Sequence, residues 1–150
     1  MFGPSSNQDT ICAPASPAGR GALSALRVSG PRAHALLTSI FQGPTAIRPR
    51  RALYGFIQDQ ERTYDEVIAI YYPGPRSYTA EDMVEIFCHG NPVIVRDLLK
   101  LLQGRGARLA EPGEFTERAF ANGRIDLTQA EAVDSLIRAH SSQEYRIWLN

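Results

Sequence analysis

Three charged side chains, Arg27, Glu85 and Arg124, stand in settings that make each of them a candidate for binding a charged or polar group. Glu85 lies within the alternating run Met83–Cys88, which predicts a strand and surrounds the carboxylate with apolar neighbours. A carboxylate in that position either meets water at the surface or accepts hydrogen bonds from a specific ligand or partner. Glu85 is therefore a candidate binding residue.

Two arginines could supply the opposite charge. Arg27 lies near the end of the predicted strand Ala22–Val28, and an arginine on an apolar strand needs a counter-charge. An internal ion pair and an anionic ligand both satisfy that need, and the sequence leaves the two open. Arg124 follows the turn residues Asn122 and Gly123, between two helical patterns, and is well placed to meet an incoming anion.

The neighbouring polar residues are predicted to have structural roles. Glu81 and Asp82 point in opposite directions on an extended chain, so we expect them to cap a turn or face water. His89 has no Cys, Asp or second His at ligand spacing, so no metal site is predicted. A short helix carries three charges that we expect to be solvated: Glu114, Glu117 and Arg118.

The elements that must position these residues can be read from apolar runs and from turns rich in Gly and Pro. Strands are predicted at Ala22–Val28, Ala52–Ile57, Glu66–Tyr72, Met83–Cys88 and, shorter, Arg108–Ala110. Helices are predicted at Pro31–Phe41, from the cap Asn91 to Gly104, and at Phe115–Ala121. No regular βαβ repeat is present. The sequence therefore predicts an α+β fold with a mixed or antiparallel sheet.

Composition excludes several classes of protein. The 150 residues suit one domain with a core, and 16 basic residues balance 16 acidic ones, unlike a strongly electrostatic nucleic-acid binder. No apolar stretch approaches a membrane span, and the first residues have no signal or transit pattern. Cys12 and Cys88 lack metal or redox spacing and are expected to be buried thiols. A cytoplasmic protein without a membrane partner is predicted.

The chain divides into three parts. Residues 1–8 are polar and predict a disordered tail, and residues 9–125 form the main domain. From residue 126 a long helical pattern begins, opened by a predicted capping box at Thr128–Glu131 and weakest at Ser141-Ser142. Either this helix packs back on the domain, or residues 126–150 begin a helical domain of a longer protein.

Three segments together resemble the N-terminal domain of the MnmE (TrmE) tRNA modification GTPases. The first is DTICAPASPAGRGALSALRVSG, Asp9–Gly30. The second is YYPGPRSYTAEDMVEIFCHGNP, Tyr71–Pro92, and the third is EPGEFTERAFANGRIDLTQAEAVDSLI, Glu111–Ile137. Their order and spacing match the family over nearly the whole chain beyond the tail.

This resemblance implies a tetrahydrofolate-binding and dimerisation domain with a fold like that of aminomethyltransferases. It implies 5-formyl- or 5,10-methylene-tetrahydrofolate as the cofactor, with family contacts carried onto Arg27, Glu85 and Arg124. The family also has a GTPase domain that uses GTP, Mg and K, which this chain lacks. With the flavoprotein MnmG (GidA), the family installs an aminomethyl or carboxymethylaminomethyl group at carbon 5 of the wobble uridine in tRNA. The chain alone is expected not to be catalytic.

Donor and acceptor chemistry agrees with the implied contacts. A pterin presents an exocyclic amine and a ring N–H, and one carboxylate such as Glu85 can accept both hydrogen bonds. The anionic glutamate tail of folate suits Arg27 or Arg124. An aromatic wall is expected from Tyr71, Tyr72 or Phe87, among which the sequence does not choose.

The sequence departs from the family pattern at three positions. Ala80 and Asn91 stand where glycine is usual, and both are predicted to lie in turns. Arg124 stands where lysine is usual, so the charge is kept while a planar fork replaces a point charge.

Two other functions remain open at this point. One is a stand-alone folate-dependent aminomethyltransferase-like protein. The other is a dimerisation or tRNA-docking module without folate chemistry, for which Arg48, Arg50 and Arg51 form a small basic cluster. No phosphate-binding loop of the G-x-x-x-x-G-K-[ST] type occurs, so GTP turnover by this chain is not expected.

Overall fold

The structure is a computed structural model that describes residues 9–43 and 46–149; the predicted tail, residues 1–8, lies outside these. Seven strands and five helices occur within the described residues. In chain order they are β1 Ile11–Pro14, β2 Gly21–Ser29, α1 Ala33–Ile40, β3 Phe41–Gln42, β4 Leu53–Gln58, β5 Thr63–Tyr72, β6 Met83–Gly90, α2 Pro92–Gly104, β7 Arg108–Leu109, α3 Glu114–Ala121, α4 Leu127–Arg138 and α5 Ser142–Leu149.

The strands form one mixed sheet in the order β3-β4-β5-β6-β2-β1-β7. Every pair is antiparallel except β1 and β7, which are parallel. The prediction of a mixed or antiparallel sheet with helices is confirmed at this level. β2 and β6 are far apart in the chain but lie side by side at the centre of the sheet. This pairing brings Arg27 and Glu85 opposite each other.

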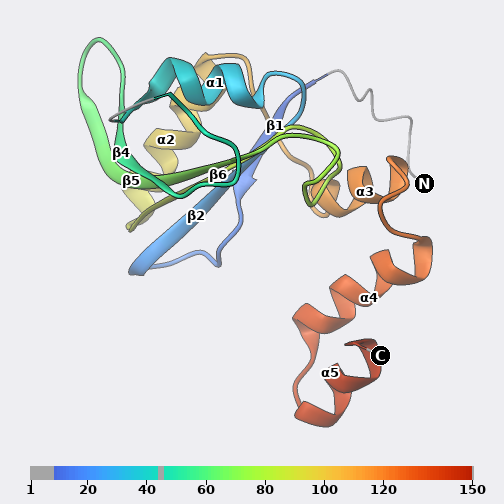
Figure 1. Cartoon of the computed structure of the whole chain (residues 1–150). Helices are drawn as coiled ribbons and strands as arrows, with labels where there is room; N and C mark the ends of the chain where they lie inside the picture. Colours follow the sequence, from blue (N-terminus) through green and yellow to red (C-terminus); the bar gives the residue numbers. More distant parts are fainter. Residues whose placement is uncertain (1–8, 44–45, 150) are drawn as a thin grey trace.

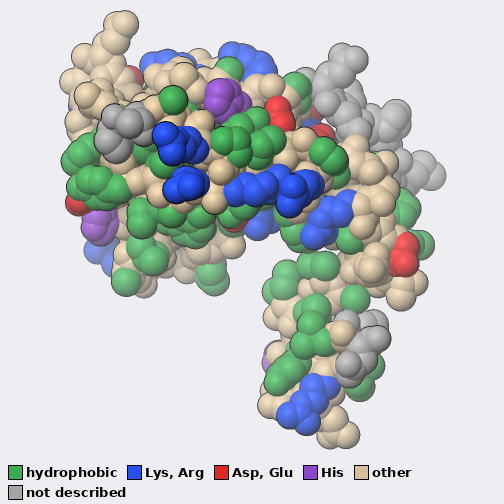
Figure 2. All heavy atoms as spheres, viewed as in Figure 1, with side chains coloured by type: hydrophobic (Ala, Val, Ile, Leu, Met, Phe, Trp, Pro, Cys, Tyr) green, Lys and Arg blue, Asp and Glu red, His purple; other side chains and the backbone are tan. Residues whose placement is uncertain are grey.

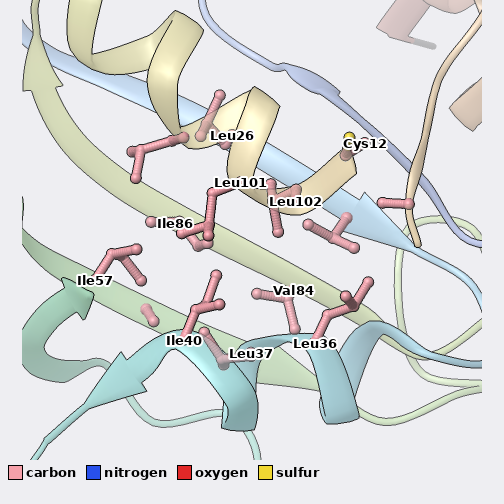
Figure 3. Packing of buried hydrophobic residues seen from close by; sticks show 14 of the residues in the cluster. Cys12, Leu26, Leu36, Leu37, Ile40, Ile57, Val84, Ile86, Leu101 and Leu102 are labelled. Atoms are coloured by element: carbon pink, nitrogen blue, oxygen red, sulfur yellow. The ribbon is translucent and has the colours of Figure 1, made fainter. Parts of the chain in front are cut away.

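One face of the sheet is covered by α1 and α2 (Figure 1). The predicted apolar side of α1 is confirmed, since Ala33, Leu36, Leu37 and Ile40 are all buried. In Figure 3, Leu36, Leu37 and Ile40 of α1 and Leu101 and Leu102 of α2 belong to one cluster on the same face of the strands. From the strands, the alternate residues of β6, among them Val84 and Ile86, enter this core. Glu85 therefore lies on the opposite face of the sheet.

The two cysteines lie in or beside this core, as predicted. Cys12 and Cys88 are free thiols with at most 1% of their surface exposed. Burial raises the pKa of each thiol to about 11, so neither is a reactive thiolate at neutral pH.

Two short strands were not predicted. β1 contains only four residues and ends in Pro14, and β3 contains two, so neither gives a readable alternation. β1 nevertheless lies inside the sheet, between β2 and β7, where pairing on both sides compensates for its length.

The helical region after residue 125 differs from the prediction in two respects. The cap is Asp126 rather than Thr128: its carboxylate accepts from the Gln129 amide, and the Gln129 side chain accepts from the Asp126 amide. The long helix is two helices, α4 and α5, separated near the predicted weak point. Both extend away from the sheet (Figure 1), and none of their described side chains is buried. No helix in the described residues is both long and apolar enough to cross a membrane.

Candidate functional site

An ion pair between neighbouring strands forms the floor of the site. Arg27 on β2 lies opposite Glu85 on β6, and its Nη2 donates to Glu85 Oε2 at 3.4 Å. The side chains are only 23% and 17% exposed. Arg27 thus has the internal partner that its setting required. Its Nε is buried without a hydrogen-bond partner among the described residues, so one donor is still unsatisfied.

Tyr78 brings the third predicted residue to this pair. The guanidinium carbon of Arg27 lies 4.8 Å from the centre of the Tyr78 ring, and that of Arg124 lies 5.2 Å from the same ring. The Tyr78 hydroxyl shares a 2.8 Å hydrogen bond with Thr116 Oγ1 on α3. Tyr78 was not among the predicted site residues, because it lies in an irregular loop where alternation gives no orientation.

Arg27, Glu85 and Arg124 line a single open cavity of about 540 Å³. Its remaining lining residues are Arg50, Tyr72, Pro75, Arg76, Ser77, Tyr78 and Met83. Four arginines therefore surround one carboxylate. A second cavity, of about 380 Å³ between α2 and the β1–β2 loop, contains none of the three predicted residues.

Of the three aromatic residues considered for the wall, Tyr72 lines the cavity. Burial raises the pKa of its hydroxyl, and the charge of Glu85 raises it further, so Tyr72 is a neutral donor at physiological pH. The Tyr71 ring instead lies 4.6 Å from that of His34. Phe87 lines a separate hollow with Leu23. The register of β5 against β6 selects Tyr72 over Tyr71, because Tyr72 pairs with Met83, which is two residues from Glu85 and on the same face. This register is not recorded in the sequence pattern.

The loop between β5 and β6 forms one wall and is held by several polar contacts. Arg50, at φ 59°, donates from its guanidinium to the carbonyls of Arg76 and Pro73. The Gly74 amide donates to the Asp82 carboxylate at 2.8 Å. Of the two roles expected for Asp82, capping a turn or facing water, this contact agrees with the first. Arg50 thus belongs to the wall of the cavity rather than to a free basic cluster.

The departures from glycine in this region have different consequences. Ala80 adopts φ 63°, a left-handed conformation that glycine adopts without strain. Asn91 has φ −125°, so no positive φ is needed there, and its side chain accepts from the Val93 amide to cap α2.

A buried ionic cluster contradicts the prediction of solvated charges on α3. Arg118 is fully buried, and its guanidinium lies 2.7 Å from Asp9 and 3.1 Å from Glu81. Glu114, only 4% exposed, pairs at 2.6 Å with Arg108, which also binds Asp9. Glu81 is likewise not a water-facing residue, because it accepts hydrogen bonds from Ser29 and Arg118.

The electrostatics of this cluster favour its charged form. The hydrogen bond from Arg108 holds the pKa of Asp9 below its usual value. Burial pushes the pKa of Glu114 upward, but hydrogen bonds from Arg108 and the Glu111 amide outweigh it and leave the pKa lowered. The cluster joins the start of β1, the β5–β6 loop and α3. Since the Arg124 amide donates to the Ala119 carbonyl at the end of α3, the cluster positions one side of the cavity.

His89 lies outside the cavity. Its Nδ1 is 2.8 Å from Asp65 Oδ1, and its amide donates to the same carboxylate. The hydrogen bond with Asp65 raises the pKa of His89. The favoured structural role for this histidine agrees with these contacts.

Comparison with known proteins gives one consistent result. The family described as GTP-binding protein TrmE N-terminus matches residues 10–124. The chain is 49% identical over 141 residues to the tRNA modification GTPase MnmE of Thermotoga petrophila, covering 94% of this chain and 31% of that protein. It is 45% identical over 149 residues to the Bacillus subtilis protein of the same name, covering 95% and 32%. The chain thus spans about a third of the length of these curated relatives, and it belongs to the TrmE (MnmE) N-terminal domain family.

Proposed function

We propose that this domain binds a reduced folate, 5-formyl- or 5,10-methylene-tetrahydrofolate, in the cavity lined by Arg27, Glu85 and Arg124. The observation that carries the proposal is a largely buried carboxylate at the floor of a cavity that also contains arginines and two tyrosines. A folate has the complementary groups: neutral N–H donors on its pterin, an aromatic body and an anionic tail.

The residues present fit that cofactor. Glu85 would accept from the pterin amine and ring N–H, where limited exposure strengthens the charge-assisted hydrogen bonds. Tyr72 and Tyr78 offer apolar ring surface, and Arg124 would bind a tail carboxylate. A bound reduced folate supplies a one-carbon unit, and this chain's residues bind and orient it.

Within a longer protein, this domain would serve tRNA modification. The relatives are named tRNA modification GTPases. We assign GTP hydrolysis, with Mg and K, to a further domain, and modification of the wobble uridine to joint action with the MnmG flavoprotein. Residues 126–150 would begin a helical domain. The strong exposure of Ile137, Ile147 and Leu149 on α4 and α5 supports this, because such apolar surface suits burial against further helices.

A homodimer is proposed from the exposed face of the sheet. Four large apolar side chains are exposed there: Leu23, Tyr54, Phe56 and Ile68. All of them except Phe56 line one apolar hollow together with Phe87. An apolar sheet face of this kind is typical of a surface that is buried on association.

Replacing Ile68 with aspartate is expected to weaken that dimer at least about tenfold, because a carboxylate would be buried without a partner. Sedimentation velocity across a concentration series measures the dissociation constant. Val93→Asp is the matched control, since Val93 is similarly exposed but lies at the start of α2. Equal dissociation constants for Ile68→Asp and the unmodified chain would refute the assignment of this face.

The folate proposal is tested by titration calorimetry with 5-formyltetrahydrofolate, where saturable binding is expected. Arg124→Gln should weaken binding about two- to fivefold, the range of an exposed ion pair, while Arg124→Lys should retain most of the affinity. Arg48→Gln, an exposed arginine that does not line the cavity, is the control. Absence of any binding heat would overturn the function, and an unchanged Arg124→Gln affinity would remove Arg124 from the site.

A further inference from the structure

The cavity carries more positive charge than a simple folate can neutralise. Its lining residues include four arginines and one glutamate, a net formal charge of +3. The glutamate tail of a folate with a single glutamate carries two carboxylates. Since Arg27 is already paired with Glu85, three arginines, Arg50, Arg76 and Arg124, are available to the tail.

These three arginines differ from Arg27 in position. All three are exposed, and within the described part of the chain none of them forms an ion pair with a carboxylate. Arg27 and Glu85 are mostly buried. The cavity therefore has a floor with one carboxylate and an outer rim with three cations. Figure 2 shows basic side chains gathered in a row on the face that carries the β5–β6 loop.

The rim is also built to a fixed shape. The Arg50 guanidinium donates to the carbonyls of Pro73 and Arg76, so the segment before β4 holds the backbone of the β5–β6 loop that carries Arg76. Asp82 fixes the same loop through the Gly74 amide. The Arg124 guanidinium lies against the Tyr78 ring. The guanidinium groups of Arg50 and Arg124 are thus held in place, whereas Arg76 is fixed through its backbone. Side chains that are already held lose less conformational freedom when an anion binds, which favours a ligand with several charges.

We infer that the rim of the cavity, Arg50, Arg76 and Arg124, is a subsite for a γ-linked oligoglutamate tail, so that polyglutamylated reduced folates are the preferred ligands. This inference rests on the proposed folate function and adds the form of the ligand. Each further glutamate adds one carboxylate and extends the tail outward from the pterin. An RNA backbone would also meet arginines, but these three converge on the cavity that contains Glu85 instead of spreading over an open surface.

Titration calorimetry with 5-formyltetrahydrofolate and with its γ-linked triglutamate tests the inference. We expect the triglutamate to bind up to about fivefold more tightly at low salt, because the three arginines can form one more exposed ion pair with it than with the two carboxylates of the monoglutamate. The ratio of the two affinities should fall toward one at about 0.5 M salt, where such pairs are screened.

The variant for this test is Arg76→Gln. Within the described residues the Arg76 guanidinium forms no hydrogen bond or ion pair, so its removal should not disturb the wall of the cavity. The ratio between triglutamate and monoglutamate affinity should fall several-fold in Arg76→Gln and stay unchanged in the control Arg51→Gln, an exposed arginine that does not line the cavity. Equal binding of the two ligands to the unmodified chain would overturn the subsite and leave the folate proposal standing. Failure of both ligands to bind would overturn both.

A gel-shift titration with tRNA separates the remaining alternative. If Arg76→Gln weakens tRNA binding and leaves the ratio of folate affinities unchanged, the rim is an RNA-binding surface and the oligoglutamate subsite is wrong.

Discussion

Replacing Arg118 with methionine is expected to lower the free energy of unfolding by about 3–5 kcal/mol. Arg118 is fully buried and contacts Asp9, Glu81 and Glu114. Removing Arg118 leaves the mostly buried Glu81 carboxylate without its cation, while Asp9 and Glu114 keep their pairs with Arg108. An uncompensated buried charge costs more than the ion pair itself contributes. Methionine keeps much of the side-chain volume, so the loss is attributed to charge rather than to a cavity.

Urea denaturation followed by circular dichroism measures this loss. Arg138→Met is the matched control, because Arg138 is 78% exposed and its one ion pair within the described residues is with Asp134 on the same helix. The control should change the free energy of unfolding by less than about 0.5 kcal/mol. An Arg118→Met change as small as that of the control would show that the ionic cluster does not stabilise the domain.

Glu85→Gln is expected to weaken reduced-folate binding about ten- to a hundredfold while the fold stays intact. Glutamine has nearly the same shape, but it presents a single acceptor oxygen and a donor amide where the pterin needs two acceptors. The substitution also removes the charge that balances Arg27, although the glutamine oxygen can still accept the hydrogen bond from its guanidinium.

Calorimetry with 5-formyltetrahydrofolate measures the affinity, and thermal unfolding checks that the variant is folded. Glu131→Gln, which removes a carboxylate from the exposed surface of α4, should bind as the unmodified chain does. A folded Glu85→Gln variant with unchanged affinity would exclude Glu85 as the pterin anchor. The proposed cavity would then need a different ligand.

The two experiments address separate properties of one arrangement. The residues of the ionic cluster of Arg118 do not line the cavity, but they tie together the segments that form its wall, whereas Glu85 lies at its floor. Arg118→Met is therefore expected to affect stability first. Glu85→Gln is expected to affect binding with little loss of stability.

Local patterns predicted much of the fold. The apolar side of α1 is four buried residues at helical spacing, and α2 begins at the Asn91 cap and ends at Gly104 as expected. Errors occurred where local signals were short or competed. β1 and β3 are too short to show alternation, and Asp126 rather than Thr128 caps α4 because its carboxylate and Gln129 satisfy each other's amides.

The candidate site was predicted in part. The sequence selected Arg27, Glu85 and Arg124, and all three line one cavity. It did not select Tyr78, Arg50 or Arg76, which lie in irregular segments without a period that would orient their side chains. The prediction that Arg118 and Glu114 are solvated was wrong, because the two residues have the helical spacing of an ordinary surface ion pair.

The sequence by itself determined the family, the alternation that separates Glu85 from the core, and the helix caps, because these depend on residues close together in the chain. Only the tertiary structure decided that Arg27 pairs with Glu85, 58 residues away, and that Arg118 is buried against Asp9, 109 residues away. It also brought three arginines to the rim of one cavity. Such contacts depend on strand register and on the packing of α3 against distant segments. Neither can be predicted from the local spacing of apolar and polar residues.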